Sequence, residues 1–346
     1  MSKKSKAHKN IETINIDDIR ESDDKKEINM LVFGENMNNI FTNTIIRTAL
    51  SLVGAYAFSP KNIVIEENTS IFNNDILRLR FSNFAIYNGE SNFPTIEDYA
   101  DRCIALEQER NERMIKPLTE LEKLQKETEE RQQSINNLHI HIDARNNTKD
   151  IMYATTNEQY ATFYLNSEQV ADIYPEEHML IHLKPNQSLV ASLKSTFDIP
   201  LNNYIHASTQ KAWHRYITET KHRLFITSYG QISGRRVIIE ACHIINKKLE
   251  LLRSKLFKAI NESDTVSTHK GRITIVNDKY TIGEIYNRRM QDHEKIKFHG
   301  YKVDHPDNNE FICQYETLGM SIIRIIDESI DSLIDDYTKV INSLKE

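Results

Sequence analysis

Two pairs of histidines have a type and spacing that could serve a metal ion. His139 and His141 are two residues apart and would share one face of a strand, and His178 and His182 are four apart. Neutral imidazole is a common zinc ligand. The second pair lies in extended sequence, where four residues span about 13 Å, so its two rings are too far apart for one ion. We therefore predict no histidine metal site.

The cysteines offer no alternative site. Cys103, Cys242 and Cys313 are separated by 139 and 71 residues, so no CxxC pair exists from which a zinc site could be built. They do not form a disulfide framework either, which favours a reducing, intracellular compartment.

Motifs of catalysis are also missing from the sequence. It contains no Gly-rich phosphate loop, HExxH, GxSxG or Walker pattern, and nine glycines leave few positions for one. The acidic pairs Glu66 with Glu67 and Asp335 with Asp336 would diverge in a regular strand or helix, so we interpret them as surface charge. The sequence predicts no catalytic residue.

Composition sets the broad class of protein. The 346 residues are 39% hydrophobic and 27% charged, which is enough to bury one large core or several smaller ones. With 44 Lys and Arg against 50 Asp and Glu, the net charge of −6 argues against a surface that grips nucleic acid by itself. The longest weakly apolar run, 48–59, is too short to span a bilayer, and the N-terminus lacks the apolar core of a secretory signal. A soluble protein with no membrane contact is predicted.

Periodicity predicts the first elements. Residues 1–27 are almost all polar or charged, so we expect a loose tail, with nucleic-acid or partner contact through its lysines as the alternative. Phe41, Ile45, Thr48 and Leu52 recur at helical spacing and predict a helix over 38–53. A strand is expected over 62–67.

The middle of the chain changes character twice. Residues 95–137 are rich in Glu, Lys, Arg and Gln and predict a charged helical arm, which could be a solvated helix on a domain edge or a binding element. From Leu138 to about Ile217, alternating segments between Pro and Asn predict a β-rich module.

The last third shows one strand and helix pattern twice. In the first copy, a strand over 223–230 precedes a helix that starts near Gly234. In the second copy, the order is a strand over 272–276, a helix over 281–290, a strand over 311–315 and a closing helix. Each long helix carries an apolar stripe with spacings of four and three, typical of helices that pack together. We expect a pseudo-dimer whose seam consists of Ile238, Cys242, Ile245, Leu249, Leu252 and Leu256 on the first helix, and Ile326, Ile330, Leu333, Tyr337, Val340 and Leu344 on the second.

Two short motifs resemble a known family. NTIIRTAL at 43–50 and ENTSIFNNDILRLRFSNFAI at 67–86 resemble the RNA polymerase α-subunit family, which includes the third-largest subunit of eukaryotic RNA polymerase II and its archaeal counterpart. The matching positions are Asn43, Thr44, Arg47, Asn68, Thr69, Ser70, Asp75 and Arg80. The sequence departs from the family at Ile46, where an arginine is usual, and at 81–84, where Phe-Ser-Asn-Phe replaces Leu-Gly-Leu-Ile.

The resemblance extends through the middle of the chain. Residues 142–152 and 178–193 resemble the inserted domain of the family, and 223–250 resemble the strand and long helix that complete its α-like half. Many relatives carry four cysteines for a metal in the insert. Those cysteines are absent here, so we expect neither a zinc site nor another cofactor in this chain.

A third stretch resembles the small partner subunit of the same family. It covers 273–290 and 298–317, and its matching positions are Tyr280, Thr281, Gly283, Gly300, Tyr301, His305 and Pro306. The two partners are separate chains in archaeal and eukaryotic polymerases. A single chain that holds both resembles the fused subunit of large nucleocytoplasmic DNA viruses.

The resemblance implies an α+β fold in which two α-subunit-like dimerisation halves of one chain form a pseudo-dimer through long packed helices. The first half would comprise 28–86 and 220–260 after a flexible charged tail over 1–27. An inserted domain would occupy 87–219, with the charged helical arm at 95–137 and a β-rich part at 138–219. A linker over 261–270 would lead to the second half, 271–346.

The implied function is that of a non-catalytic assembly platform in a multisubunit DNA-dependent RNA polymerase of viral transcription. Its partners would be the largest and second-largest subunits and small polymerase subunits, with DNA and RNA reached only through the complex. The expected location is the viral factory of the host cytoplasm, with virion and nucleus left open. The residues implied in binding the large subunits are Asn43, Thr44, Arg47, Asn68, Thr69, Ser70, Asp75, Arg80, Thr281, Gly283 and Arg288.

Alternatives remain at both levels. Arg47 could pair with a group of its own fold, the glycines could serve the backbone, and His305 with Pro306 could form a turn. A free-standing nucleic-acid-binding or protein-interaction module is the alternative for the whole chain, and it would show steeply salt-dependent binding if its ligand were nucleic acid.

Overall fold

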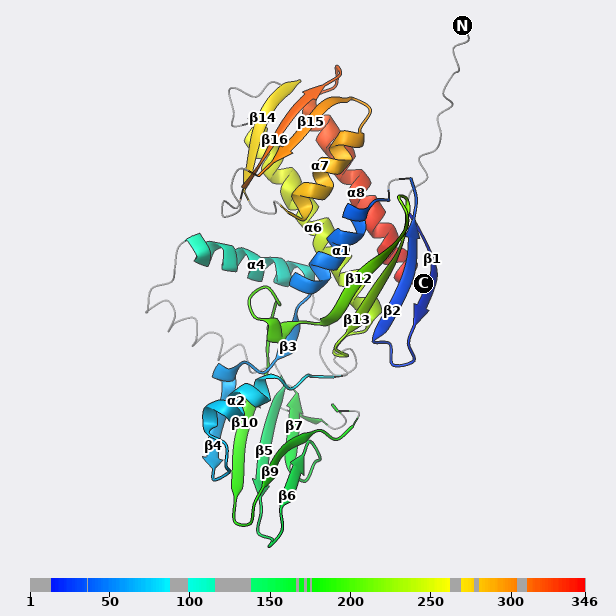
Figure 1. Cartoon of the computed structure of the whole chain (residues 1–346). Coiled ribbons are helices and arrows are strands. Elements are labelled where there is room, and N and C mark those ends of the chain that lie inside the picture. Colours follow the sequence, from blue (N-terminus) through cyan, green and yellow to red (C-terminus); the bar gives the residue numbers. More distant parts are fainter. Residues whose placement is uncertain are drawn as a thin grey trace. The chain divides into compact units, whose positions relative to one another are not determined.

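The computed structural model describes residues 14–35, 37–87, 99–115, 138–165, 168–170, 173–174, 176–261, 269–276, 280–303 and 310–345. The chain divides into two compact units (Figure 1). The first is drawn from Met1–Leu50, Lys211–Thr227 and Gly234–Glu346, and the second from Ser51–Gln210 and Ser228–Ser233. In the described part of the chain, none of the helices has the length and apolar character needed to cross a membrane.

The first unit begins with a four-stranded sheet in the order β1-β2-β13-β12. Its strands are β1 (Asn15–Glu21), β2 (Glu27–Phe33), β12 (Thr209–Thr218) and β13 (Lys221–Ser228). Along β13, buried and half-buried side chains alternate, so one face of the sheet covers the core. Helices α1 (Asn39–Ser51) and α6 (Gly234–Asn261) follow β2 and β13. Gly234 allows the start of α6 to approach the sheet, because a Cβ there would lie 2.7 Å from the Lys26 carbonyl oxygen.

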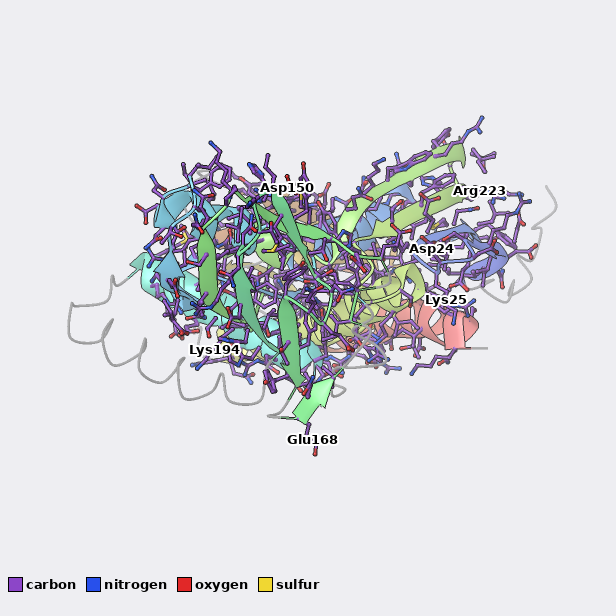
Figure 2. The ribbon with its side chains drawn as sticks, turned by 90° about the horizontal axis from the view of Figure 1, so that it is seen from below. Asp24, Lys25, Asp150, Glu168, Lys194 and Arg223 are labelled. Atoms are coloured by element: carbon purple, nitrogen blue, oxygen red, sulfur yellow. The ribbon has the colours of Figure 1, made fainter. Side chains whose placement is uncertain are left out.

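The loose tail expected over residues 1–27 is wrong for its described part. β1 pairs antiparallel with β2, and the turn that joins them contains Asp24 and Lys25, whose φ of 56° is left-handed (Figure 2). Ile14 is buried. The backbone of an edge strand is ordered by hydrogen bonds to the neighbouring strand, so β1 forms although it has few isoleucines. Residues 1–13 lie outside the described residues.

A second sheet in the same unit repeats this arrangement. Strands β14 (Lys270–Val276), β15 (Ile296–Lys302) and β16 (Glu310–Thr317) pair antiparallel in the order β14-β16-β15. Helix α7 (Ile282–Asp292) follows β14, and helix α8 (Ile322–Lys345) follows β16. In the first sheet, β2 precedes the short helix α1, β13 precedes the long helix α6, and β12 lies on the far side of β13. In the second sheet, β14 precedes α7, β16 precedes α8, and β15 lies on the far side of β16. The order β14-β16-β15 therefore corresponds to β2-β13-β12.

The two long helices, α6 and α8, lie side by side (Figure 1). All twelve residues of the two apolar stripes are buried. Polar contacts flank them: Asn246 Nδ2 donates to Thr338 Oγ1 over 3.1 Å, and Arg253 pairs with Asp327 at 3.7 Å and also with Asp331. Because higher numbers on α6 meet lower numbers on α8, the helices are antiparallel.

The second unit is built around a five-stranded sheet in the order β4-β10-β5-β7-β8. Its strands are β4 (Ile63–Asn68), β5 (His139–Arg145), β7 (Ala161–Leu165), β8 (Glu168–Val170) and β10 (Ser188–Lys194). Two smaller pairs join β3 (Ala55–Ala57) to β11 (Thr196–Asp198) and β6 (Met152–Thr155) to β9 (Met179–Leu183). Short 3-10 turns lie at Pro60–Asn62 and Tyr204–His206. Helix α2 (Asn74–Ser82) contributes Leu77 and Phe81 to the core.

Two expected boundaries need correction. Residues 51–86 were expected in the first half but belong to the second unit, because β4 pairs with β10 and α2 packs on the same core. The insert was expected to end at 219, but β12 pairs with β13, so Lys211–Thr227 belong to the first unit, and Ser228–Ser233 return to the second. Of the expected linker, Asn261 ends α6 and Lys270 begins β14, whereas 262–268 lie outside the described residues.

The described part of the charged arm is helix α4 (Tyr99–Ile115). Its first turns are attached to the second unit, since the Tyr99 hydroxyl donates to the Gly54 carbonyl over 2.6 Å and the Tyr99 ring meets Phe197 edge to face. Residues 116–137 of the expected arm lie outside the described residues.

Candidate partner-binding surfaces

Helix α1 carries the first motif and presents two of its three residues. Asn43 and Arg47 are exposed, whereas Thr44 is buried and its hydroxyl donates to the Ile40 carbonyl over 2.8 Å. The expectation that Thr44 touches a partner is therefore wrong for this fold. In this chain the position faces the interior, where the Thr44 hydroxyl finds its partner in the backbone of its own helix.

Arg47 joins the two halves of the first unit. Its Nη1 donates to the carbonyl oxygen of Tyr280, just before α7, over 3.2 Å. A second link between α1 and the C-terminal half is the stacking of Phe41 on Tyr337 of α8, with ring centroids 4.3 Å apart. Arg47 thus has a partner within its own fold, and its exposed surface is left to another chain.

The second motif forms the turn between β4 and α2. The Asn68 Oδ1 accepts from the Ser70 amide over 3.0 Å and from its hydroxyl over 2.7 Å, and the Asn68 Nδ2 donates to the Phe72 carbonyl over 2.8 Å. The Thr69 hydroxyl oxygen accepts from the Ser188 amide over 2.7 Å. These hydrogen bonds order the turn that leads into α2, and partner contact by Asn68, Thr69 and Ser70 stays a prediction.

Helix α2 turns an apolar face outward. It buries Leu77 and Phe81, while Ile76 and Leu79 are 50% and 62% exposed, and Ile71 in the preceding turn is 55% exposed. We name Ile71, Ile76 and Leu79 the α2 surface. Exposed apolar residues grouped on one helix face mark interaction sites. Sequence reasoning missed these residues. The available signal was that Ile76 and Leu79, three residues apart, lie on a different face of the helix from Leu77 and Phe81.

Two charged residues of the motif flank the α2 surface. Asp75 is exposed and pairs with Arg78, with Oδ1 and Nη1 3.1 Å apart. Arg80 is half-buried, and no hydrogen bond or ion pair within the described residues occupies its guanidinium. Arg80 is therefore available to a carboxylate of another chain.

The motif around α7 is mostly internal. Gly283 is buried, Thr281 is half-buried immediately before the helix, and Arg288 is exposed and pairs with Asp292 at 3.3 Å. Of these three expected contact residues, Arg288 alone offers a charged side chain to a partner. His305 and Pro306 lie outside the described residues.

A buried ion pair fastens α7 to α8. The Arg289 Nη2 lies 2.6 Å from Asp336 Oδ2, and its Nη1 donates to the Ser332 hydroxyl over 2.5 Å. Asp336 is buried, so the interpretation of Asp335 and Asp336 as surface charge is wrong for the second of them. Adjacent residues on a helix point about 100° apart, which allows Asp336 to face α7 while Asp335 faces solvent.

The candidate metal and redox residues form no site. Among the described residues, no group of three or more His, Cys, Asp or Glu side chains could hold a metal ion, and the three cysteines are buried and unbonded. Burial raises the pKa of Cys313 to about 12, which suppresses its thiolate at neutral pH.

Comparison with known proteins identifies the second half of the first unit. Residues 270–343, from β14 to near the end of α8, match the family model of the RNA polymerase Rpb3/Rpb11 dimerisation domain. The chain is a relative of RNA polymerase subunits. The RNA polymerase II subunit RPB11 of Schizosaccharomyces pombe is 28% identical over 91 residues, which cover 26% of this chain and 74% of RPB11.

The similarity to a second relative extends beyond this domain. A protein assigned as a DNA-directed RNA polymerase subunit in Acanthamoeba polyphaga mimivirus is 22% identical over 326 residues, covering 91% of this chain and 89% of the mimivirus protein. The match therefore includes both units in one viral chain. The family resemblance drawn from the sequence motifs is confirmed, including its giant-virus type.

Proposed function

We propose that this chain is the non-catalytic assembly platform of a viral DNA-directed RNA polymerase, on which the two large catalytic subunits dock. Its relationship to Rpb3/Rpb11 subunits supports membership of such a polymerase. The proposal adds that transcription chemistry resides in the partners, that the chain needs no zinc, and that DNA and RNA are met only in the assembled complex. The viral factory in the host cytoplasm is the proposed location.

The observation that carries the proposal is the repeated strand order of the two sheets. The orders β2-β13-β12 and β14-β16-β15 correspond strand for strand, and each set leads into a long helix. Together with the antiparallel packing of α6 on α8, this supports a pseudo-dimer in which the fused halves replace two separate subunits. Both stripes would expose a long apolar ridge if the halves were separated, so the seam gives the platform one fixed form.

Two exposed regions support docking of the second-largest subunit. Asn43 and Arg47 lie on the solvent side of α1, and the α2 surface with Arg80 offers apolar contact next to a cation. Interfaces are commonly built this way, with an apolar centre and charged residues at its rim. For the largest subunit, Arg288 on α7 is the proposed contact.

The test is co-purification of the large subunits with the tagged full chain from cells that make the complete polymerase. We expect both large subunits to co-purify with the wild-type chain, and nucleotide incorporation to require them. Leu79→Asp and Arg80→Glu should each reduce recovery of the second-largest subunit at least fivefold while the melting temperature changes little. Val64→Asp, at a residue of β4 that is 55% exposed, is the matched control.

Two results would overturn this proposal. One is recovery of neither large subunit with a folded wild-type chain. The other is salt-sensitive binding of nucleic acid by the isolated chain with affinity in the specific range, which would support the nucleic-acid-binding alternative.

A further inference from the structure

Strand β12 gives the first sheet an open edge. In the order β1-β2-β13-β12, one side of β12 pairs with β13, and the described residues place no strand on the other. β12 is 10 residues long, and none of its side chains from Gln210 to Thr218 is buried. A long edge with free backbone N–H and C=O groups is a ready template for an added strand.

This edge carries more apolar surface than a solvated strand requires. Trp213, Tyr216 and Ile217 are 50%, 55% and 43% exposed. The Trp213 ring is fixed in place, because it stacks on Phe225 of β13 with centroids 3.9 Å apart and an interplanar angle of 6°. Tyr216 lies three residues from Trp213, so the exposed groups occupy both faces of the strand. A preorganised aromatic ring at an open edge is typical of an interface.

The charges at the edge have one sign. Lys211 and Arg215 alternate with Trp213 and Ile217 along the strand, and β12 contains no acidic residue although the chain carries a net charge of −6. Within the described residues no carboxylate pairs with Lys211, Arg215 or Lys221, and the Lys221 ammonium lies 5.8 Å from the ring centroid of Phe33. By contrast, Arg223 on β13, which Figure 2 labels, pairs with Asp18. The outer strand is thus cationic and lacks internal counter-ions.

We propose that β12 binds an extended, acidic segment of another polymerase subunit, which adds to the sheet as its next strand. Backbone hydrogen bonds would give the pairing, and alternate side chains would give the specificity. Carboxylates of the added strand would face Lys211 and Arg215, and its apolar side chains would cover Trp213 and Ile217. A polypeptide strand would use the unpaired backbone of β12 and the exposed apolar side chains on both of its faces. A nucleic-acid strand would use only the cations and one aromatic ring for stacking, so these features favour a polypeptide. The identity of the partner as a polymerase subunit rests on the proposed function.

Hydrogen exchange and zero-length cross-linking on the intact complex test this pairing. The amides of 211–218 should exchange at least tenfold more slowly in the assembled, nuclease-treated polymerase than in the isolated full chain. A carbodiimide should join the Lys211 amine to an Asp or Glu of an extended segment in another subunit. Lys194, exposed at the end of β10, is the comparison lysine on the same chain (Figure 2).

A charge-reversed pair of variants supplies the specificity control. Lys211→Glu with Arg215→Glu should weaken retention of the cross-linked subunit at least tenfold, whereas Lys149→Glu with Lys194→Glu, which makes the same change in net charge on the second unit, should not. Unchanged exchange at 211–218 in a complex that contains both large subunits would overturn the inference and leave the proposed function standing. Protection that disappears after nuclease treatment would overturn it in favour of nucleic acid. If the large subunits did not co-purify with the chain, the result would count against the proposed function instead. Slower exchange of the β12 amides in the presence of another acidic chain would then still support the strand addition.

Discussion

The two sheets of the first unit share a strand order but differ at two points. The N-terminal sheet has β1 on the outer side of β2, whereas the described residues place no strand on the outer side of the corresponding β14, whose other side pairs with β16. The N-terminal half also carries most of the second unit, Ser51–Gln210, between α1 and β12, where the C-terminal half has only the short connection from Asp292 to Ile296 between α7 and β15. The two halves thus differ in their outer strand and in a surface connection, while each contributes one long helix with a buried apolar stripe to the packing of α6 on α8.

The strongest test of this comparison separates the halves. Cutting the chain within 262–268 should leave two pieces that remain associated when co-expressed, because only the effective concentration given by the tether is lost. Each piece expressed alone should aggregate or be degraded, since α6 or α8 would expose its apolar stripe. Size-exclusion chromatography of the pieces, together and apart, measures this. An N-terminal piece that is soluble, monomeric and cooperatively folded alone would contradict the pseudo-dimer.

The next largest effect concerns the buried pair of the C-terminal half. Asp336→Ala leaves the Arg289 side chain, of which only 13% is exposed, without its carboxylate and should lower the free energy of unfolding by about 3 kcal/mol. Asp335→Ala, at the exposed neighbouring residue, should change it by less than about 0.5 kcal/mol. Urea unfolding of both variants measures the difference. Equal effects would mean that α7 and α8 are held by apolar packing alone.

Asp336 also illustrates what the sequence could and could not predict. The stripes of α6 and α8 were readable because apolar periodicity depends only on the helix repeat. The direction of one carboxylate depends on which element packs beside it, and spacing alone does not contain that information. Thr44 is a similar case: the motif marks the position, but only the packing of α1 distinguishes an internal hydroxyl from a partner contact.

Edges were the second kind of feature that the sequence did not predict. β1 is polar and has few apolar residues, so its order comes from pairing with β2, which a local reading cannot detect. The unit boundary at Ser51 likewise follows from β4 pairing with β10, more than 100 residues later in the chain. The α2 surface went unnoticed because exposed and buried isoleucines look alike in a sequence.

Acidification should affect the C-terminal half through His299. Burial lowers the pKa of this side chain from 6.5 to about 4, and its Nδ1 lies 2.8 Å from the Asn287 Oδ1. The unfolded chain therefore binds the proton more readily, and the stabilisation present above pH 6.5 is lost as the pH falls toward 4. At pH 5 the loss should be about 2 kcal/mol relative to pH 7.

The His299 prediction is checked by urea unfolding at a series of pH values. His299→Gln should flatten the dependence between pH 4 and 6.5. Burial also lowers the pKa of His222 on β13, so the N-terminal half contributes a slope of the same sign. A wild-type slope that survives His299→Gln unchanged would assign the acid sensitivity to other buried histidines, such as His222 in this half and His206 in the second unit.

The smallest expected effect concerns β1, the strand with no counterpart among the described residues of the C-terminal half. The Arg235 guanidinium binds both oxygens of Glu21 at 2.8 and 3.0 Å, and its Nη1 donates to the Leu344 carbonyl over 2.7 Å, so it links β1, α6 and the end of α8. Glu21 and Arg235 are 24% and 32% exposed. Glu21→Gln should therefore lower the free energy of unfolding by only about 0.5–1 kcal/mol, less in high salt. Arg20→Ala, which removes a 68% exposed partner of Asp18, is the control with no measurable effect. The opposite outcome is that Glu21→Gln, like Arg20→Ala, leaves both the free energy of unfolding and the hydrogen exchange of the β1 and β2 amides unchanged. In that case backbone pairing alone would hold β1. The extra strand would then be an addition to the sheet that the helix seam does not need.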